Sequence, residues 1–158
     1  MTSSVALLLK ELRLPAFVRH YEKLWQTAVE KGWSHSDYLA ALCEYELAER
    51  FTRRTQSWVR EGRLAPGKTL STLDNSVLSR TNQALIAKLH QDLSWAHHAD
   101  NILLIGPSGT GKTHIANALG YRLIEQGIRC KLFPAIGLVQ QLQQAKRALD
   151  LMSEMSKL

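Results

Sequence analysis

Apolar residues recur at helical spacing from the beginning of the chain. Between Ser4 and Leu12 they fall at every third or fourth position, which predicts a short helix. A second amphipathic run begins at Pro15, a residue that fits the first turn of a helix, and it ends at Gly32, a typical helix stop. The pattern therefore predicts two helices with a short break between them.

The next part of the chain also follows the helical period, with one interruption. Ser34 and Asp37 have the spacing of a capping box, and the apolar positions after them predict a third helix that ends near Gly62. The segment Leu64–Arg80 contains Pro-Gly and Asp-Asn pairs and loses the period, which predicts a linker whose middle could still lie on a neighbouring surface. The helical period returns over Asn82–Trp95. The first hundred residues are thus predicted to contain only helices.

The pattern changes after residue 100. Asn101–Ile105 is a short apolar run of the kind typical of a buried strand, and His114–Gln126 returns to helical spacing. Ile128–Phe133 is again strand-like, and Ile136–Leu158 reads as one further helix. Two strand–helix steps after an all-helical region predict an α/β protein with a helical N-terminal region.

The loop between the first predicted strand and its helix has the pattern GxxxxGK[ST], which is typical of a phosphate cradle. Glycines let successive backbone N–H groups turn inward, and the following helix adds the positive end of its dipole. The predicted phosphate-binding residues are Gly106, Pro107, Ser108, Gly109, Thr110, Gly111, Lys112 and Thr113. Lys112 is expected to contact the β- and γ-phosphates, and Thr113 the Mg²⁺ that bridges them. The alternative is a glycine-rich turn that binds no ligand.

Composition adds a basic segment to this picture. The chain has 158 residues and a formal net charge of +6. Most of the excess lies in one stretch, where Glu61 is the only acidic residue between the cations and where Phe51 and Trp58 are interleaved. Its basic residues are Arg50, Arg53, Arg54, Arg60, Arg63 and Lys68. Clustered cations with aromatic neighbours are a candidate DNA-binding site, and a solvated helix face is the alternative.

Neither a membrane span nor a disulfide framework is expected. The longest apolar runs, such as Val5–Leu9, are far below the roughly 20 residues that a span needs, and no cleavage site follows this one. Cys43 and Cys130 match no disulfide or metal pattern, which favours buried, reduced thiols. The sequence therefore predicts a cytoplasmic protein.

The run Asn101–Ala116, NILLIGPSGTGKTHIA, strongly resembles the transposition helper ATPases of the IstB family and, less specifically, the DnaC-like helicase loaders. The resemblance extends upstream to Leu12–Phe17, Leu47–Arg50 and Pro66–Leu70 and downstream to Leu138–Lys146, so it covers nearly the whole chain. It implies an AAA+ ATPase that uses ATP and Mg²⁺, assembles on DNA as a homo-oligomer and acts with a transposase. Residues 1–80 would then form a helical region, with a linker, that binds DNA or a partner. Residues 81–158 would form the first part of a parallel α/β P-loop core, incomplete at its C-terminus.

One part of the family pattern is missing from the sequence. A P-loop ATPase needs an acidic residue at the end of a second core strand to hold the Mg²⁺ shell. After Lys112 the acidic residues are only Glu125, Asp150 and Glu154, and none ends an apolar strand. The resemblance places the acidic motif, the sensor residues and the arginine finger beyond Leu158. We therefore expect a fragment that binds ATP without hydrolysing it, whether it is a pseudogene product, a mis-called frame or an expression truncation.

The same reasoning leaves three functions open. The first is an ATP-binding helper of transposition, the second a helicase loader, and the third a non-enzymatic fragment that binds DNA or protein. Without later strands, the two predicted strands would expose unpaired backbone groups and apolar faces unless they pair with each other. We therefore also predict a weakly stable or aggregation-prone chain.

Overall fold

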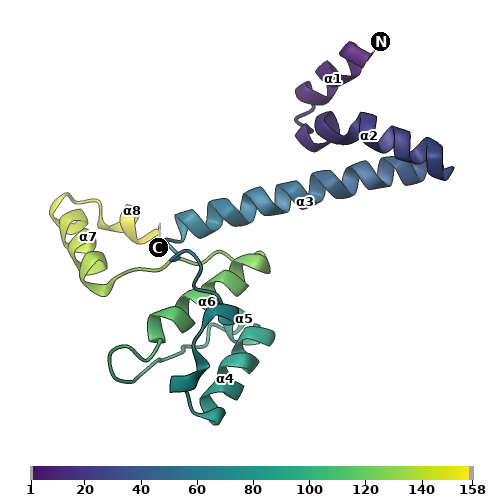
Figure 1. Cartoon of the computed structure of the whole chain (residues 1–158). Coiled ribbons are helices and arrows are strands. Elements are labelled where there is room, and N and C mark those ends of the chain that lie inside the picture. The colour runs from purple at the N-terminus through teal and green to yellow at the C-terminus, as the bar shows by residue number, and fades with distance from the viewer. Residues whose placement is uncertain (1, 157–158) are drawn as a thin grey trace. The chain divides into compact units, whose positions relative to one another are not determined.

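The computed structural model describes residues 2–156, with the side chains of residues 5–156 (Figure 1). The chain divides into two compact units, with the boundary between Gln56 and Ser57. Two 3₁₀ turns, Leu70–Thr72 and Asn75–Val77, lie between α3 and α4 in the sequence. The α-helices in chain order are α1 (Thr2–Glu11), α2 (Pro15–Lys31), α3 (His35–Glu61), α4 (Arg80–Gln91), α5 (Ser94–His97), α6 (Lys112–Glu125), α7 (Ala135–Arg147) and α8 (Leu151–Ser156).

The first unit contains α1, α2 and most of α3, as the helical spacing predicted. The capping box that begins α3 is confirmed, because Asp37 N donates to Ser34 Oγ and Ser34 N donates to Asp37 Oδ2, both at 3.1 Å. Ala16, Phe17 and Leu42 are buried and belong to the small apolar interior of this unit. The carboxylate-bearing side chain of Glu46 is buried as well.

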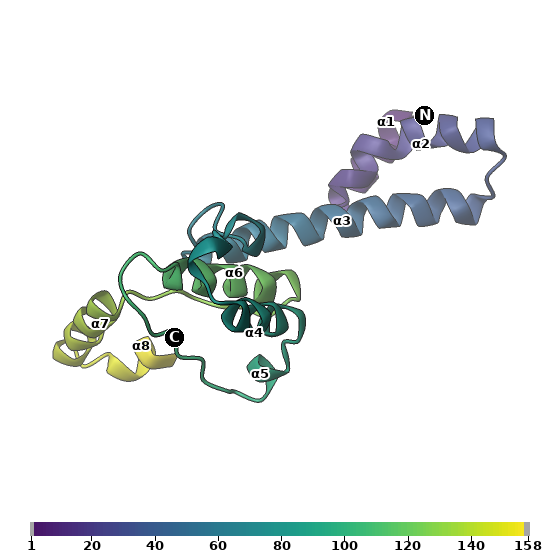
Figure 2. The ribbon, with the colours of Figure 1, turned by 60° about the horizontal axis from the view of Figure 1, so that its bottom comes forward.

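The second unit is organised around α6. Ile115 and Leu119 of this helix form a buried cluster with Leu73 and with Ile86 of α4. Helices α4 and α6 lie side by side in both ribbon views, and contacts join them (Figures 1 and 2). The cluster holds the beginning of α6 in place within the unit.

The predicted parallel α/β core is wrong for the part of the chain that the structure describes. Between residues 2 and 156 the structure has helices, turns and extended segments but no strand. The second predicted strand lies against the end of α3, where Leu132 N donates to Gly62 O (2.8 Å). An extended segment becomes a strand only when another segment completes its ladder of hydrogen bonds. The two predicted strands do not form such a ladder with each other.

The first predicted strand is an extended segment with one buried and one exposed face. Ile102 and Leu104 pack against the buried cluster, whereas Leu103 and Ile105 are 82% and 90% exposed. A strand that packs on a core shows the same alternation. Here one face of the segment is covered by the buried cluster, and the other face is exposed. The exposed apolar face agrees with the expectation drawn from the sequence, and the weak stability inferred from it stays a prediction.

The predicted helix over Ile136–Leu158 is interrupted. Two helices, α7 and α8, take its place, and residues 157–158 lie outside the described part of the chain. Leu149 adopts a left-handed conformation (φ +57°) just after α7, and Glu154 N then donates to Asp150 O at the beginning of α8. The apolar stripe continues across this break, so the sequence pattern did not reveal it.

The segment expected to be a linker packs within the second unit. Leu64 and Leu73 are buried, and the turn Leu70–Thr72 contacts α6. The division of the structure after Gln56 differs from the functional boundary at residue 80, which stays a prediction.

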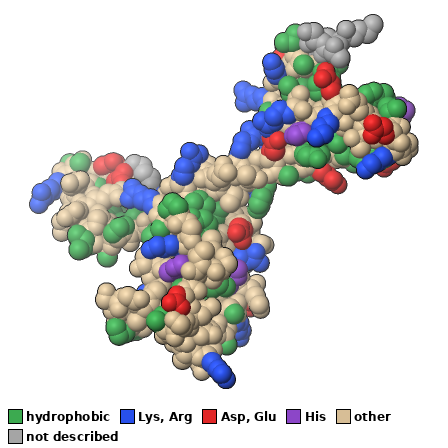
Figure 3. All heavy atoms as spheres, viewed as in Figure 1, with side chains coloured by type: hydrophobic (Ala, Val, Ile, Leu, Met, Phe, Trp, Pro, Cys, Tyr) green, Lys and Arg blue, Asp and Glu red, His purple; other side chains and the backbone are tan. Residues whose placement is uncertain are grey.

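The surface carries both apolar and charged side chains. Figure 3 shows hydrophobic side chains exposed among the polar ones on the face that it draws.

Both cysteines are free, but Cys43 is exposed, so its predicted burial is wrong, and Cys130 is half-buried. Within residues 2–156 no helix combines the length and the apolar character that crossing a membrane requires.

Candidate phosphate-binding site

The glycine-rich loop adopts the conformations that its glycines allow. Gly109 and Gly111 have φ angles of +81° and +80°, in the left-handed region that side chains with a Cβ rarely enter. Helix α6 begins at the next residue, Lys112, so the loop leads directly into a helix N-terminus. The first N–H groups of a helix have no partner within the helix and carry the positive end of its dipole. The loop and α6 together therefore form an environment suited to an anion.

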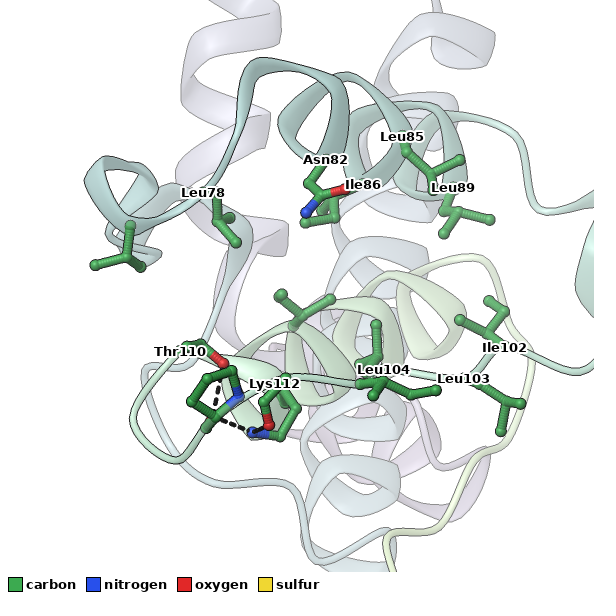
Figure 4. A pocket seen from close by; sticks show the side chains of 15 residues that line it. Leu78, Asn82, Leu85, Ile86, Leu89, Ile102, Leu103, Leu104, Thr110 and Lys112 are labelled. Carbon is green, nitrogen blue, oxygen red and sulfur yellow. Dashed lines mark hydrogen bonds between the residues drawn. The ribbon is translucent and has the colours of Figure 1, made fainter.

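Lys112 lies over the loop that precedes it. Its Nζ donates to Gly106 O (2.9 Å) and to Pro107 O (2.5 Å), and Thr110 Oγ1 donates to Pro107 O (2.9 Å). These bonds place the ammonium group inside the curve of the loop, as the dashed lines of Figure 4 show. A phosphate oxygen bound there would meet a positive charge at short range.

Thr113 is the next residue of the motif and is exposed in the first turn of α6. Its backbone oxygen accepts from Asn117 Nδ2 (2.6 Å). A threonine hydroxyl is a suitable oxygen ligand for Mg²⁺ beside bound phosphates. Glu125 lies at the opposite end of α6, about 18 Å away at the helical rise per residue, and cannot serve this position.

A segment that the sequence did not connect with this site lies along α6. His114 Nε2 donates to Thr69 O (2.8 Å), and Asn117 Oδ1 accepts from Ala65 N (2.7 Å). Tyr121 Oη donates to Ala65 O (3.1 Å). Asn117 is fully buried, and both ends of its amide are hydrogen-bonded. We call residues 64–73 the flanking segment, because it lies beside the helix that begins at the phosphate loop.

A mostly apolar cavity of about 310 Å³ adjoins the loop. Figure 4 shows side chains of α4 on one side and those of the extended segment and the loop on the other. Lys112 and Thr110 line its loop end, and Asn82 contributes an amide from α4. Its other lining residues include Leu78, Leu85, Ile86, Leu89, Ile102, Leu103 and Leu104. A small ligand with an anionic and an apolar part would find both environments here.

The predicted DNA-contacting residues divide between the two units. In the first unit, Arg50 Nε donates to Glu46 Oε1 (2.8 Å), and an Arg53 guanidinium nitrogen lies 3.7 Å from the same oxygen. The guanidinium of Arg54 lies 5.7 Å from the centre of the Phe51 ring. Part of the positive charge of this helix therefore balances a buried carboxylate.

In the second unit, Arg60 and Arg63 are exposed near the end of α3, and Lys68 is half-buried in the flanking segment. Arg63 has its guanidinium 5.9 Å from the centre of the Phe133 ring. No sequence pattern joins Phe133 to this cluster, because it lies far from the basic segment along the chain.

Comparison with known proteins identifies ATP-binding proteins as relatives of this chain. The family described as IstB-like ATP binding protein matches residues 7–158. An insertion-sequence ATP-binding protein of Sinorhizobium fredii is 38% identical over 98% of this chain and 52% of its own length. The IS21 ATP-binding protein of Pseudomonas aeruginosa is 29% identical over 89% of this chain and 52% of its own length. The corresponding IS5376 protein of Geobacillus stearothermophilus is 31% identical over 85% of this chain and 53% of its own length.

The chain thus spans about half the length of these curated relatives. The match to the family nevertheless reaches into both units and includes the whole loop from Gly106 to Thr113. The chain therefore belongs to the IstB-like ATP-binding protein family.

Proposed function

We propose that this chain binds Mg–ATP through the loop Gly106–Thr113 and that it serves as an ATP-binding helper of DNA transposition. The observation that carries the proposal is the loop itself, in which two left-handed glycines lead into α6 with Lys112 and Thr113 in its first turn. The names of the relatives, which are insertion-sequence ATP-binding proteins, supply the transposition context. A transposase, DNA and further copies of the chain are the partners that this function requires.

Each residue of the proposed site has a defined role. The amides of the loop and of the first turn of α6 donate to phosphate oxygens. The ammonium group of Lys112 leaves the carbonyls of Gly106 and Pro107 and contacts the β- and γ-phosphates instead. Thr113 supplies an oxygen to the Mg²⁺. The apolar cavity beside Lys112 receives the nucleoside.

Binding without turnover is the expected behaviour of this 158-residue polypeptide. Hydrolysis needs an acidic group near the metal to hold its shell and help position water. Of the acidic residues after Lys112, Glu125 lies at the far end of α6, and Asp150 and Glu154 follow α7. Glu154 accepts a hydrogen bond from Gln141 in α7. None of the three lies in the first turn of α6.

The site is tested by titrating Mg–ATP into the wild-type chain and into Lys112→Ala, with calorimetry as the readout. The variant should lose detectable binding, because it removes the cation that contacts the phosphates. Lys146→Ala, which removes an exposed lysine at the end of α7, is the matched control and should bind as the wild type does. Equal affinities for wild type and Lys112→Ala would exclude this loop as the nucleotide site, and phosphate release by the wild type would contradict binding without turnover.

A further inference from the structure

Two segments far apart in the sequence meet at the end of α3. Leu132 N donates to Gly62 O (2.8 Å), which joins the residues after α3 to the extended residues 128–134. A Cβ on Gly62 would lie 2.5 Å from Cys130 O and 2.9 Å from Trp58 O. Real Cβ atoms do not approach backbone oxygens so closely, so this junction requires glycine.

The junction gathers arginines that the sequence separates. Arg129 places its guanidinium 5.2 Å from the centre of the Trp58 ring, and Arg63 lies at 5.9 Å over Phe133. Arg129 of the extended residues therefore rests on a ring in the last turn of α3, and Arg63, just after α3, rests on a ring of the extended residues. We call Arg63 and Arg129, with these two rings, the stacked-arginine surface.

The charge of the stacked-arginine surface is less compensated than that of the first unit. Arg50 and Arg53 share the buried carboxylate of Glu46. By contrast, no carboxylate of the described residues lies within ion-pair distance of Arg63 or Arg129. The neighbouring Glu61 instead accepts a hydrogen bond from Ser57 Oγ (2.8 Å). The surface is therefore positive.

The chemistry of this surface suits phosphodiester groups. A guanidinium is always charged, and its planar fork of N–H donors matches the oxygens of a phosphate. Stacking on a ring limits the rotamers of an arginine, so less conformational entropy is lost when it binds. Contacts with phosphates position a protein on DNA without reading its sequence.

We propose that the stacked-arginine surface binds the phosphate backbone of DNA. This inference rests on the proposed function, because a helper of transposition acts on DNA, and it adds the surface that makes the contact. It assigns Arg129 to DNA binding beside Arg63. It further makes Gly62 a positioning residue, since the glycine allows the two segments to meet.

The test compares two double variants of equal charge, Arg63→Gln with Arg129→Gln, and Lys146→Gln with Arg147→Gln. All four residues are exposed and belong to the second unit. Binding to a fluorescent DNA duplex of arbitrary sequence is measured by anisotropy over a range of salt concentrations. Loss of two phosphate contacts should reduce the steepness of log K against log salt by about 2 in the first variant. The control should change the slope little.

A second variant tests the geometry with the charge unchanged. Gly62→Ala forces the two segments apart and should weaken DNA binding while circular dichroism shows the helices retained. Unchanged DNA binding by this variant would overturn the role of Gly62. Equal slopes for the two double variants, or absence of DNA binding by the wild type, would overturn the assignment of the surface. In either case, if the wild type binds Mg–ATP and Lys112→Ala does not, the proposed nucleotide site is still supported.

Discussion

Glu46 is a charged side chain in the small interior of the first unit, and its surroundings explain how it is tolerated. Its Oε2 accepts from Ala16 N at the beginning of α2 (2.9 Å), and Oε1 accepts from Arg50 Nε. Arg50 in turn donates to Arg13 O (3.1 Å), in the turn that joins α1 to α2. One carboxylate and one guanidinium thus hold this turn against α3.

We expect Glu46→Ala to lower the free energy of unfolding of the chain by about 2 kcal/mol, because it leaves the buried Ala16 N–H without an acceptor and Arg50 without its ion pair. Urea unfolding followed by circular dichroism measures the change. The control is Glu44→Ala, an exposed glutamate on the same helix, which should alter stability much less.

The pH dependence of this difference provides a further control. Burial by itself raises the pKa of Glu46, but the hydrogen bonds from Arg50 and Ala16 N and the charges of Arg50 and Arg53 outweigh it, so the pKa lies below its ordinary value. The ionised form is therefore favoured by folding. Its contribution is fully present above the unfolded pKa of about 4.3 and is lost as the pH falls through the folded pKa. A difference between wild type and Glu46→Ala that grew on acidification would contradict this account.

At the scale of elements, α6 and the flanking segment behave as one piece around the phosphate loop. The amide of Asn117 donates to Thr113 O, within the loop motif, and accepts from Ala65 N. His114, the residue after Thr113, donates to Thr69 O. With the bond from Tyr121 to Ala65 O, the beginning and middle of α6 are connected to both ends of residues 65–69. The phosphate loop cannot shift relative to this segment without breaking some of these bonds.

Asn117→Leu should free the flanking segment from α6, because the leucine is close in size but cannot accept from Ala65 N. We expect a loss of about 2 kcal/mol in the free energy of unfolding, together with faster hydrogen exchange in residues 64–73. Tyr121→Phe removes the hydroxyl that donates to Ala65 O and should lower the free energy of unfolding by about 1 kcal/mol. Unchanged exchange in the flanking segment of Asn117→Leu would show that apolar packing alone holds it.

At the scale of the whole molecule, periodicity located the helical regions because helical hydrogen bonds are local, but it did not reveal the breaks between α4 and α5 and between α7 and α8. The capping box at Ser34 and the loop before α6 were predictable for the same reason. Strands depend on a partner segment, so the apolar run Asn101–Ile105 did not reveal whether it would be paired. The stacking of Arg129 on Trp58 was also hidden, because it depends on a chain reversal that no local pattern records.

The exposed face of residues 101–107 bears on the solubility of the whole chain. Leu103→Lys with Ile105→Lys should reduce aggregation, measured by light scattering, and leave the unfolding midpoint nearly unchanged, because both side chains are already exposed. The matched variant Ile102→Lys with Leu104→Lys places charge against the buried cluster and should unfold at lower urea. If the wild type and the double variant Leu103→Lys, Ile105→Lys aggregated equally, the surface responsible for aggregation would lie elsewhere.

The junction at Gly62 has a consequence for how the second unit is held together. The stretch of chain between Gly62 and Leu132 includes α4, the phosphate loop and α6. A polyanion that contacts Arg63 and Arg129 at once would bind only the folded arrangement, in which the two ends of this stretch lie together, and would therefore stabilise that arrangement by mass action. The nucleic acid would then stabilise the fold around the nucleotide site reversibly, because high salt weakens its binding and dilution of the salt restores it.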